Sequence, residues 1–157
     1  MQRKSFIHHV LIVDHKYSDE LAIQKEHQSY NFIILPDFQN ALNLINTNFI
    51  PMVIVCNIDL QCNSFTGLSF ISNIRCNESW SSIPIIALSR ESHADVILES
   101  LKRGAIDFVK CPYQPVELLK RIQHASNINR PQYCQQPLKI DNKNSQLKEL
   151  RKCMLRR

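Results

Sequence analysis

The sequence alternates short apolar runs with longer segments in which apolar residues recur at the spacing of a helix. The runs are rich in β-branched residues and are bounded by polar residues or prolines, which is typical of strands. They cover residues 9–13, 32–35, 52–56, 84–88 and 108–109. Runs without polar alternation indicate strands buried on both faces of a parallel sheet. We expect the run at 52–56, which follows Pro51, to lie in the middle of that sheet.

Helical spacing predicts five helices between and after these runs. They are expected at about 18–29, 37–45, 67–74, 93–103 and 115–122. The residues expected to face inward from the last two are Val96, Ile97, Leu101, Val116, Leu118, Leu119 and Ile122. Alternating strands and helices with short connections predict an α/β fold, with a five-stranded, doubly wound parallel sheet and right-handed crossovers. Ligands of such sheets bind outside the carboxyl ends of the strands, where Asn57 and Asp59 follow the central run.

Composition narrows the possible chemistry. Gly67 and Gly104 are the only glycines, which excludes a glycine-rich phosphate loop, and Gly104 is expected to end the fourth helix. The apolar runs are far shorter than a membrane span and no apolar signal segment precedes the first, so we expect no membrane association. The six cysteines include no Cys-x-x-Cys pair, and the six histidines show no metal-ligand spacing. A reduced, cytoplasmic protein without a cofactor is therefore the expectation.

Charge divides the chain near residue 127. Residues 1–126 carry 11 Lys/Arg against 12 Asp/Glu, whereas residues 127–157 carry 8 against 2. The polar, proline-containing segment 127–137 is typical of a linker between a domain at 1–126 and a basic tail at 138–157. The tail could be a short amphipathic helix, the start of a signalling helix in a longer protein, a basic arm for nucleic acid, or a disordered end. Its apolar residues at helical spacing are Leu147, Leu150 and Met154.

Five stretches, in their order and spacing, resemble the receiver domain of two-component response regulators, the CheY-like superfamily. They are Val10–His15, Pro51–Leu60 with Gly67-Leu68, Pro84–Ser89, Gly104–Tyr113 and Pro115–Leu119. Each stretch is short, and their combination over about residues 7–125 makes the resemblance specific. The resemblance implies the flavodoxin-like (βα)5 receiver fold and a role in bacterial phosphorelay signal transduction, not an enzymatic one.

The sequence departs from this family at the positions that carry its chemistry. Receivers hold Mg²⁺ with acids at the ends of the first and central strands, the central aspartate takes a phosphoryl group, and a lysine neutralises the developing charge. By resemblance, the acidic pair falls on Asp14 and His15, the phosphoacceptor on Asn57, the switch residues on Ser89 and Phe108, and the lysine on Cys111. An amide has no anionic oxygen to attack phosphorus, and a histidine is a poor Mg²⁺ ligand. We therefore expect a pseudo-receiver that binds neither phosphate nor metal and acts through protein–protein interaction.

A second register, meaning a second alignment of this sequence with the family's positions, is open. The family's spacing from the phosphoacceptor to the next glycine fits Asp59 and Gly67 without an insertion. It makes the protein a phosphorylatable response regulator, with Mg²⁺ held by Asp14 and Asp59. The apolar run that ends before Asn57 favours the first register, which requires a two-residue insertion within 61–66. In either register the lysine is missing.

The partner surface implied by the resemblance is the face formed by the fourth helix, the fifth strand and the fifth helix. Its residues lie in Val96–Arg103, at Phe108 and in Pro115–Arg121. A protein partner on this face, with a homodimer as one form, is the main expectation. The alternative from another class is a transcriptional or RNA-binding regulator that binds nucleic acid through its basic tail.

Overall fold

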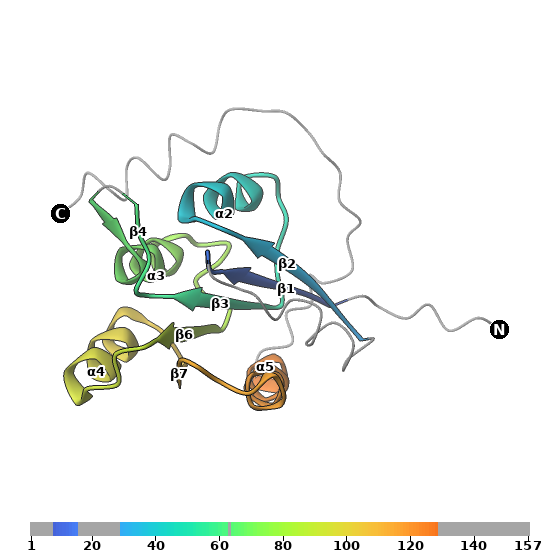
Figure 1. Ribbon diagram of the computed structural model, residues 1–157. Helices are drawn as coiled ribbons and strands as arrows, with labels where there is room; N and C mark the ends of the chain where they lie inside the picture. Colours follow the sequence, from blue (N-terminus) through green and yellow to red (C-terminus); the bar gives the residue numbers. More distant parts are fainter. Residues whose placement is uncertain (1–7, 16–28, 63, 129–157) are drawn as a thin grey trace.

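The computed structural model describes residues 8–15, 29–62 and 64–128 (Figure 1). Its strands are β1 (His8–Val13), β2 (Tyr30–Leu35), β3 (Val53–Asn57), β4 (Gln61–Cys62), β5 (Phe65–Thr66), β6 (Ile85–Ser89) and β7 (Asp107–Lys110). Its helices are α2 (Phe38–Ile45), α3 (Gly67–Cys76), α4 (Ala94–Arg103) and α5 (Pro115–Ile128). The helix expected from residue 18, the linker beyond residue 128 and the basic tail lie outside the described residues.

Five strands form one parallel sheet in the order β2-β1-β3-β6-β7, with β3 at its centre. This order confirms the expected doubly wound α/β fold and the central place of the run at 52–56. Because the strands are parallel, their carboxyl ends meet at one edge of the sheet. The paired residues nearest that edge are Val13 with Cys56, Asn57 with Leu88, and Ser89 with Lys110.

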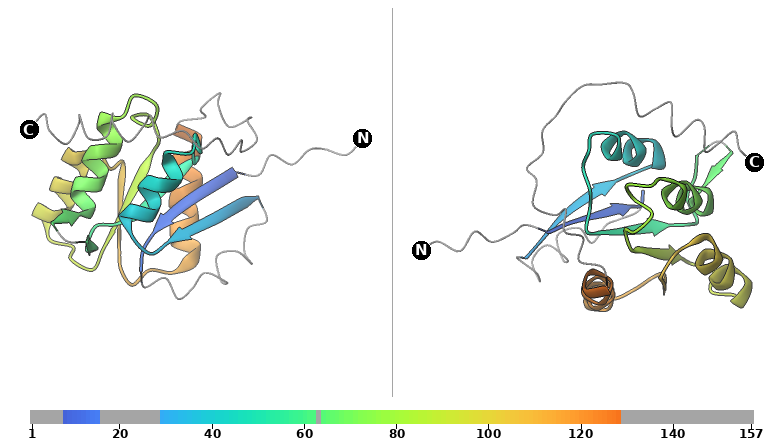
Figure 2. Two further views of the ribbon diagram at one scale, coloured as in Figure 1. Left: turned by 90° about the horizontal axis from the view of Figure 1, so that it is seen from above. Right: turned by 180° about the vertical axis from the view of Figure 1, so that it is seen from behind.

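Both faces of the sheet are covered, which explains why the strands are apolar throughout. Figure 2 shows α2 and α3 over one face and α5 over the other. The core under α2 and α3 includes Leu11, Phe38, Ile54, Phe70, Ile74 and Ile85. The core under α5 includes Val10, Val55, Ile86, Leu118 and Ile122. Alternate residues of each strand thus serve opposite cores, as the two-residue period of a strand requires.

Local chemistry sets the ends of the helices. At the start of α2, Asp37 Oδ1 accepts a hydrogen bond from the backbone N–H of Asn40 at 2.8 Å. At the start of α3, Thr66 Oγ1 accepts one from the backbone N–H of Ser69 at 3.2 Å. Gly104 follows the last turn of α4 with a φ of 118°, a left-handed conformation that agrees with its expected capping role.

Helix α5 runs for 14 residues and ends at Ile128. Its last two residues, 127 and 128, belong to the segment that composition assigns to a linker, so the helix continues slightly beyond the expected domain boundary. Within the described parts of the chain, none of the helices combines the length and the apolar character needed to cross a bilayer.

Two apolar residues expected to face inward lie on the surface instead. Leu101 of α4 is 40% exposed and Val116 of α5 is 46% exposed, so the inward expectation is wrong for both. Helix α4 contacts the core through Val96 and buries Ser100, and Leu101 lies to one side of that narrow face. The buried face of α5 is formed by Leu118, Leu119, Ile122 and Ala125, and helical geometry turns Val116 away from it.

A short antiparallel hairpin, β4–β5, connects the end of the β3 loop to α3. It occupies the segment 61–66, in which the Asn57 register requires two extra residues. Gly67 then begins α3 directly against the loop that follows β3. A Cβ atom added to Gly67 would lie 2.4 Å from Ile58 Cα, so only glycine permits this approach. The contact holds the β3 loop beside the strand ends.

Candidate functional site

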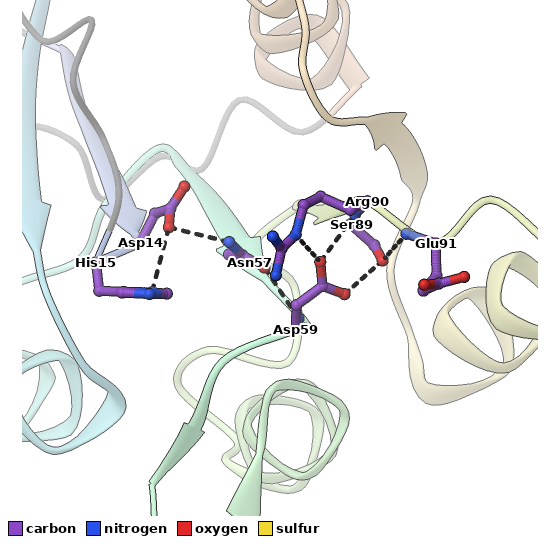
Figure 3. Close-up of polar contacts among 7 residues, drawn as sticks. All are labelled: Asp14, His15, Asn57, Asp59, Ser89, Arg90 and Glu91. Carbon is purple, nitrogen blue, oxygen red and sulfur yellow. Dashed lines mark hydrogen bonds and ion pairs between the residues drawn. The ribbon is translucent and has the colours of Figure 1, made fainter.

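The carboxyl ends of β3, β6 and β7 are joined by backbone hydrogen bonds just beyond the regular sheet. Ile58 N–H donates to the carbonyl of Leu88, and Cys111 N–H donates to the carbonyl of Ser89, both at 2.8 Å. Residues that leave different strands are therefore held side by side. The polar side chains gathered at this edge are Asp14, His15, Asn57, Asp59, Ser89 and Arg90 (Figure 3).

Asn57 is the last residue of β3 and is buried. Its Nδ2 donates a hydrogen bond to Asp14 Oδ1 at 2.9 Å, and its Oδ1 accepts one from the backbone N–H of Asp59 at 2.9 Å. Because Oδ1 receives a backbone N–H, the NH₂ group has to point toward the carboxylate of Asp14. The buried amide is thus satisfied at both ends by groups of the protein.

Asp59 lies two residues beyond β3, and its carboxylate is turned toward the end of β6. Asp59 Oδ1 accepts a hydrogen bond from Ser89 Oγ at 2.5 Å, and Oδ2 accepts one from the backbone N–H of Arg90 at 2.8 Å. The Nε of Arg90 lies 3.7 Å from the same Oδ2. Both carboxylate oxygens of Asp59 are therefore engaged by donors from the last residue of β6 and the residue after it.

These contacts form a continuous polar chain along the strand ends (Figure 3). It begins at His15, whose Nδ1 lies 3.8 Å from Asp14 Oδ1, and continues through Asn57 and Asp59 to Ser89. The His15 side chain is 47% exposed and lies at the rim. The centre is covered, since Asp14 and Asn57 are buried and Ser89 has no exposed surface.

Cys111 directly follows β7 and is half-buried. The pKa of its thiol is raised to about 11, mainly by burial and further by the carboxylates of Asp14 and Asp59, while Arg90 acts in the opposite direction. The thiol is protonated at neutral pH, so the position expected for a lysine carries no charge.

The family resemblance implies Mg²⁺ as the cation of this site. Mg²⁺ requires oxygen ligands in near-octahedral geometry. Asp14 already accepts the NH₂ group of Asn57, and the carboxylate oxygens of Asp59 are engaged by Ser89 and Arg90. In the part of the chain that the structure describes, no three His, Cys, Asp or Glu side chains are grouped so as to hold a metal ion. As these side chains lie, the described residues do not present the open set of oxygen ligands that this cation needs.

The contacts of Phe108 and Arg90 were not predicted from the sequence. Phe108, the expected aromatic switch residue, is half-buried and packs against the core under α2 and α3. The sequence leaves open whether Arg90 reaches the pocket or points to solvent. In the structure its Nε faces Asp59 while its side chain is 67% exposed. The bond between Asp59 and Ser89 has no sequence signal beyond the polarity of both residues.

The chain is similar to known receiver domains and response regulators. The family model described as "Response regulator receiver domain" matches residues 10–123. The two-component response regulator ORR6 of Oryza sativa subsp. japonica is 27% identical over 112 residues, which cover 70% of this chain and 66% of that protein. The phosphate regulon transcriptional regulatory protein PhoB of Shigella flexneri is 21% identical over 115 residues, which cover 73% of this chain and 49% of that protein. The chain spans less than two thirds of either relative.

A solved structure agrees with these sequence matches. The receiver domain of the Francisella response regulator 1452 is 26% identical and aligns with a TM-score of 0.66. The alignment covers 78% of this chain and 98% of that domain. The similarity therefore extends over nearly the whole of the solved receiver domain.

Proposed function

Because the chain belongs to the family of response regulator receiver domains, we propose that it is a signalling module that works without accepting a phosphoryl group. In this proposal Asn57 occupies the phosphoacceptor position and Cys111 the lysine position. Ser89 provides the hydroxyl group of the switch, and Phe108 provides the aromatic side chain of the switch. The output is a protein–protein contact in the cytoplasm, with no phosphoryl transfer.

The observation that carries the proposal is the 2.9 Å hydrogen bond from Asn57 Nδ2 to Asp14 Oδ1. Asn57 ends the central strand beside β1, which is where a phosphoacceptor has to lie to share a cation with Asp14. Two carboxylates at this distance would repel each other unless a cation or a proton lay between them. The amide supplies hydrogens instead, so Asp14 is satisfied without a metal. The same amide offers no anionic oxygen for attack on phosphorus.

The contacts of Asp59 support the same register. A carboxylate nucleophile needs an oxygen that is free to approach the phosphorus atom. One oxygen of Asp59 is bound by Ser89 Oγ and the other by the backbone N–H of Arg90. The uncharged thiol of Cys111 also leaves the pocket without the lysine cation that stabilises a transferred phosphoryl group in this family.

The proposed partner surface is the face formed by α4, β7 and α5. The exposed apolar side chains on or next to these elements include Leu98, Leu101, Ile106 and Val116. Arg121 Nη1 and Asp107 Oδ2 form an ion pair of 3.1 Å between β7 and α5. Apolar side chains beside charged ones suit a protein partner, and a second copy of the chain is one partner of this kind.

Nucleic-acid binding through residues 138–157 stays a prediction from composition, because that tail lies outside the described residues. It predicts binding that weakens as salt rises and that disappears when 138–157 are deleted.

Intact mass after incubation with acetyl phosphate and Mg²⁺ tests the proposal, with a phosphorylatable receiver run alongside to show that the conditions support transfer. We expect no phosphoryl adduct on the natural chain. The variant with Asn57→Asp and Cys111→Lys restores both family positions, and we expect it to gain an adduct. An adduct on the natural chain that disappears with Asp59→Asn overturns the proposal and makes Asp59 the phosphoacceptor.

A further inference from the structure

The end of β6 carries a small carboxylate-binding site whose donors are distinct from the pair formed by Asn57 and Asp14. We propose that Ser89 and Arg90 form this site and that Asp59 is its built-in ligand, which ties the β3 loop to the connection leading into α4. The inference rests on the proposed function only in treating Asp59 as a ligand and not as a phosphoacceptor.

The geometry is that of a carboxylate held at both oxygens. Asp59 Oδ1 receives the hydroxyl of Ser89 at 2.5 Å, and Oδ2 receives the backbone N–H of Arg90 at 2.8 Å. The guanidinium of Arg90 adds a positive charge 3.7 Å from Oδ2. Hydrogen bonds to an ionised acceptor are about twice as strong as neutral ones, and contact at both oxygens also fixes orientation.

The donors of the site are held in place by groups other than Asp59. Ser89 ends β6 and is fully buried, and its Oγ accepts a hydrogen bond from the backbone N–H of Glu91 at 2.9 Å. Since that lone pair is used, the single hydrogen of the hydroxyl is free to point at Asp59. The carbonyl of Ser89 is held in turn by Cys111 N–H at 2.8 Å. A site built in this way is expected to keep its shape when its ligand is removed.

The contact joins two parts of the chain that α3 separates in sequence. Asp59 lies in the loop between β3 and β4, whereas residues 89–93 lead into α4, which carries the exposed side chains of Leu98 and Leu101. The carboxylate therefore positions the start of the helix that forms part of the proposed partner surface. The Asp59 carboxylate thus acts as a positioning group, and this role requires no bound second molecule.

Replacement of the ligand in solution tests the inference. Asp59→Ala removes the carboxylate, and sodium acetate offers the same group, with sodium chloride at equal concentration as the control. In amide NMR spectra of Asp59→Ala, we expect acetate to shift the signals of Arg90 and Glu91 saturably. We also expect acetate to raise the melting temperature of the variant by about 2–4 °C over chloride. The natural chain and the variant Asp59→Ala with Ser89→Ala are expected not to respond.

Equal responses of the natural chain and Asp59→Ala to acetate would overturn the inference, as would no response in folded Asp59→Ala. Asp95→Ala, which removes an exposed acid of α4, is the matched control for the loss of one negative charge. If Asp59→Ala does not fold, a double-mutant cycle of Asp59→Asn, Ser89→Ala and their combination tests the contact instead. Coupling of about 3- to 10-fold in the unfolding constant supports the contact, and additive effects contradict it. A phosphoryl adduct on Asp59 would overturn the proposed function as well, whereas the absence of coupling removes only this inference.

Discussion

The side-chain amide of Asn57 lies 2.9 Å from the carboxylate of Asp14, with its nitrogen as the donor. The direction of this bond matters, because a carboxylate in the same place has no hydrogen to give. The pair joins the ends of two neighbouring strands, β1 and β3, at the buried centre of the site. Because the amide is neutral, the only negative charge within this pair is that of Asp14.

Asn57→Asp places a second carboxylate at hydrogen-bond distance from Asp14. We expect the free energy of unfolding to fall by about 2 kcal/mol in EDTA at neutral pH, because two like charges are then buried together. Mg²⁺ is expected to restore part of the loss by neutralising the pair. Urea denaturation with EDTA and with Mg²⁺ measures both effects. The natural chain is the control, and a natural chain stabilised by Mg²⁺ as strongly as the variant would contradict this account.

The thiol of Cys111 gives a prediction for alkaline pH. Its pKa is about 11 in the folded chain, raised above the ordinary value of 9.0, so the unfolded chain loses this proton first as pH rises. The contribution of Cys111 to stability is complete below about pH 9 and is lost as pH rises toward 11. We expect the natural chain to lose more stability over that interval than Cys111→Ser does. Chemical denaturation at several pH values measures the difference, and parallel curves would argue against it.

The same pKa predicts slow alkylation of Cys111. At pH 8 about one thiol in a thousand is ionised, and the thiolate is the reactive form. Iodoacetamide is therefore expected to modify the exposed Cys62 well before the half-buried Cys111. Peptide mass mapping over time gives both rates. Faster reaction at Cys111 would show that the pocket lowers its pKa.

Arg75 of α3 gives a prediction for stability. It donates hydrogen bonds to three backbone carbonyls: from Nε and Nη2 to Gly104 at 3.0 and 2.7 Å, and from Nη1 to Ser81 at 3.0 Å and to Ile83 at 2.7 Å. Arg75→Met keeps the apolar stem but leaves these carbonyls without their donors, so we expect a loss of about 2–4 kcal/mol. Arg121→Met, which breaks an exposed ion pair with Asp107, is the control and should cost less than about 1 kcal/mol. Urea denaturation compares the two.

Gly67→Ala tests the close approach of α3 to the β3 loop. The new methyl group would overlap Ile58 Cα, a backbone atom that cannot move without shifting the loop between Asn57 and Asp59. We expect a loss of about 3 kcal/mol, at the upper end for overpacking. Ser64→Ala in the exposed hairpin turn is the control and should change stability by less than about 0.5 kcal/mol. Equal losses of stability in the two variants would mean that the loop can shift at little cost in free energy.

Sequence reasoning succeeded where a local pattern carries its own physical cause. An unbroken apolar run such as Val53–Cys56 fits only a strand covered on both faces, and β3 is the central strand of the sheet. Asp37 and Gly104 mark helix ends through the chemistry of their own backbone neighbours. These signals need no knowledge of the rest of the chain.

Other features depend on partners that are distant in the sequence. The contact between Asp59 and Ser89 spans 30 residues, and Asp59 lies in the β3 loop that packs against Gly67. The orientation of α4 also could not be predicted from the sequence alone, because apolar residues lie on more than one side of that helix. Periodicity could not decide that Val96 contacts the core and Leu101 does not.

The bond between Asn57 and Asp14 uses atoms that are present in every copy of the chain. If the proposed function holds, the content of the pocket is the same in each molecule, whatever the supply of acyl phosphate or magnesium. Such a population keeps no record of past stimuli in its covalent bonds, and only the number of molecules can vary. On the proposed function, synthesis and degradation set the strength of the signal, and the partner responds to concentration by mass action.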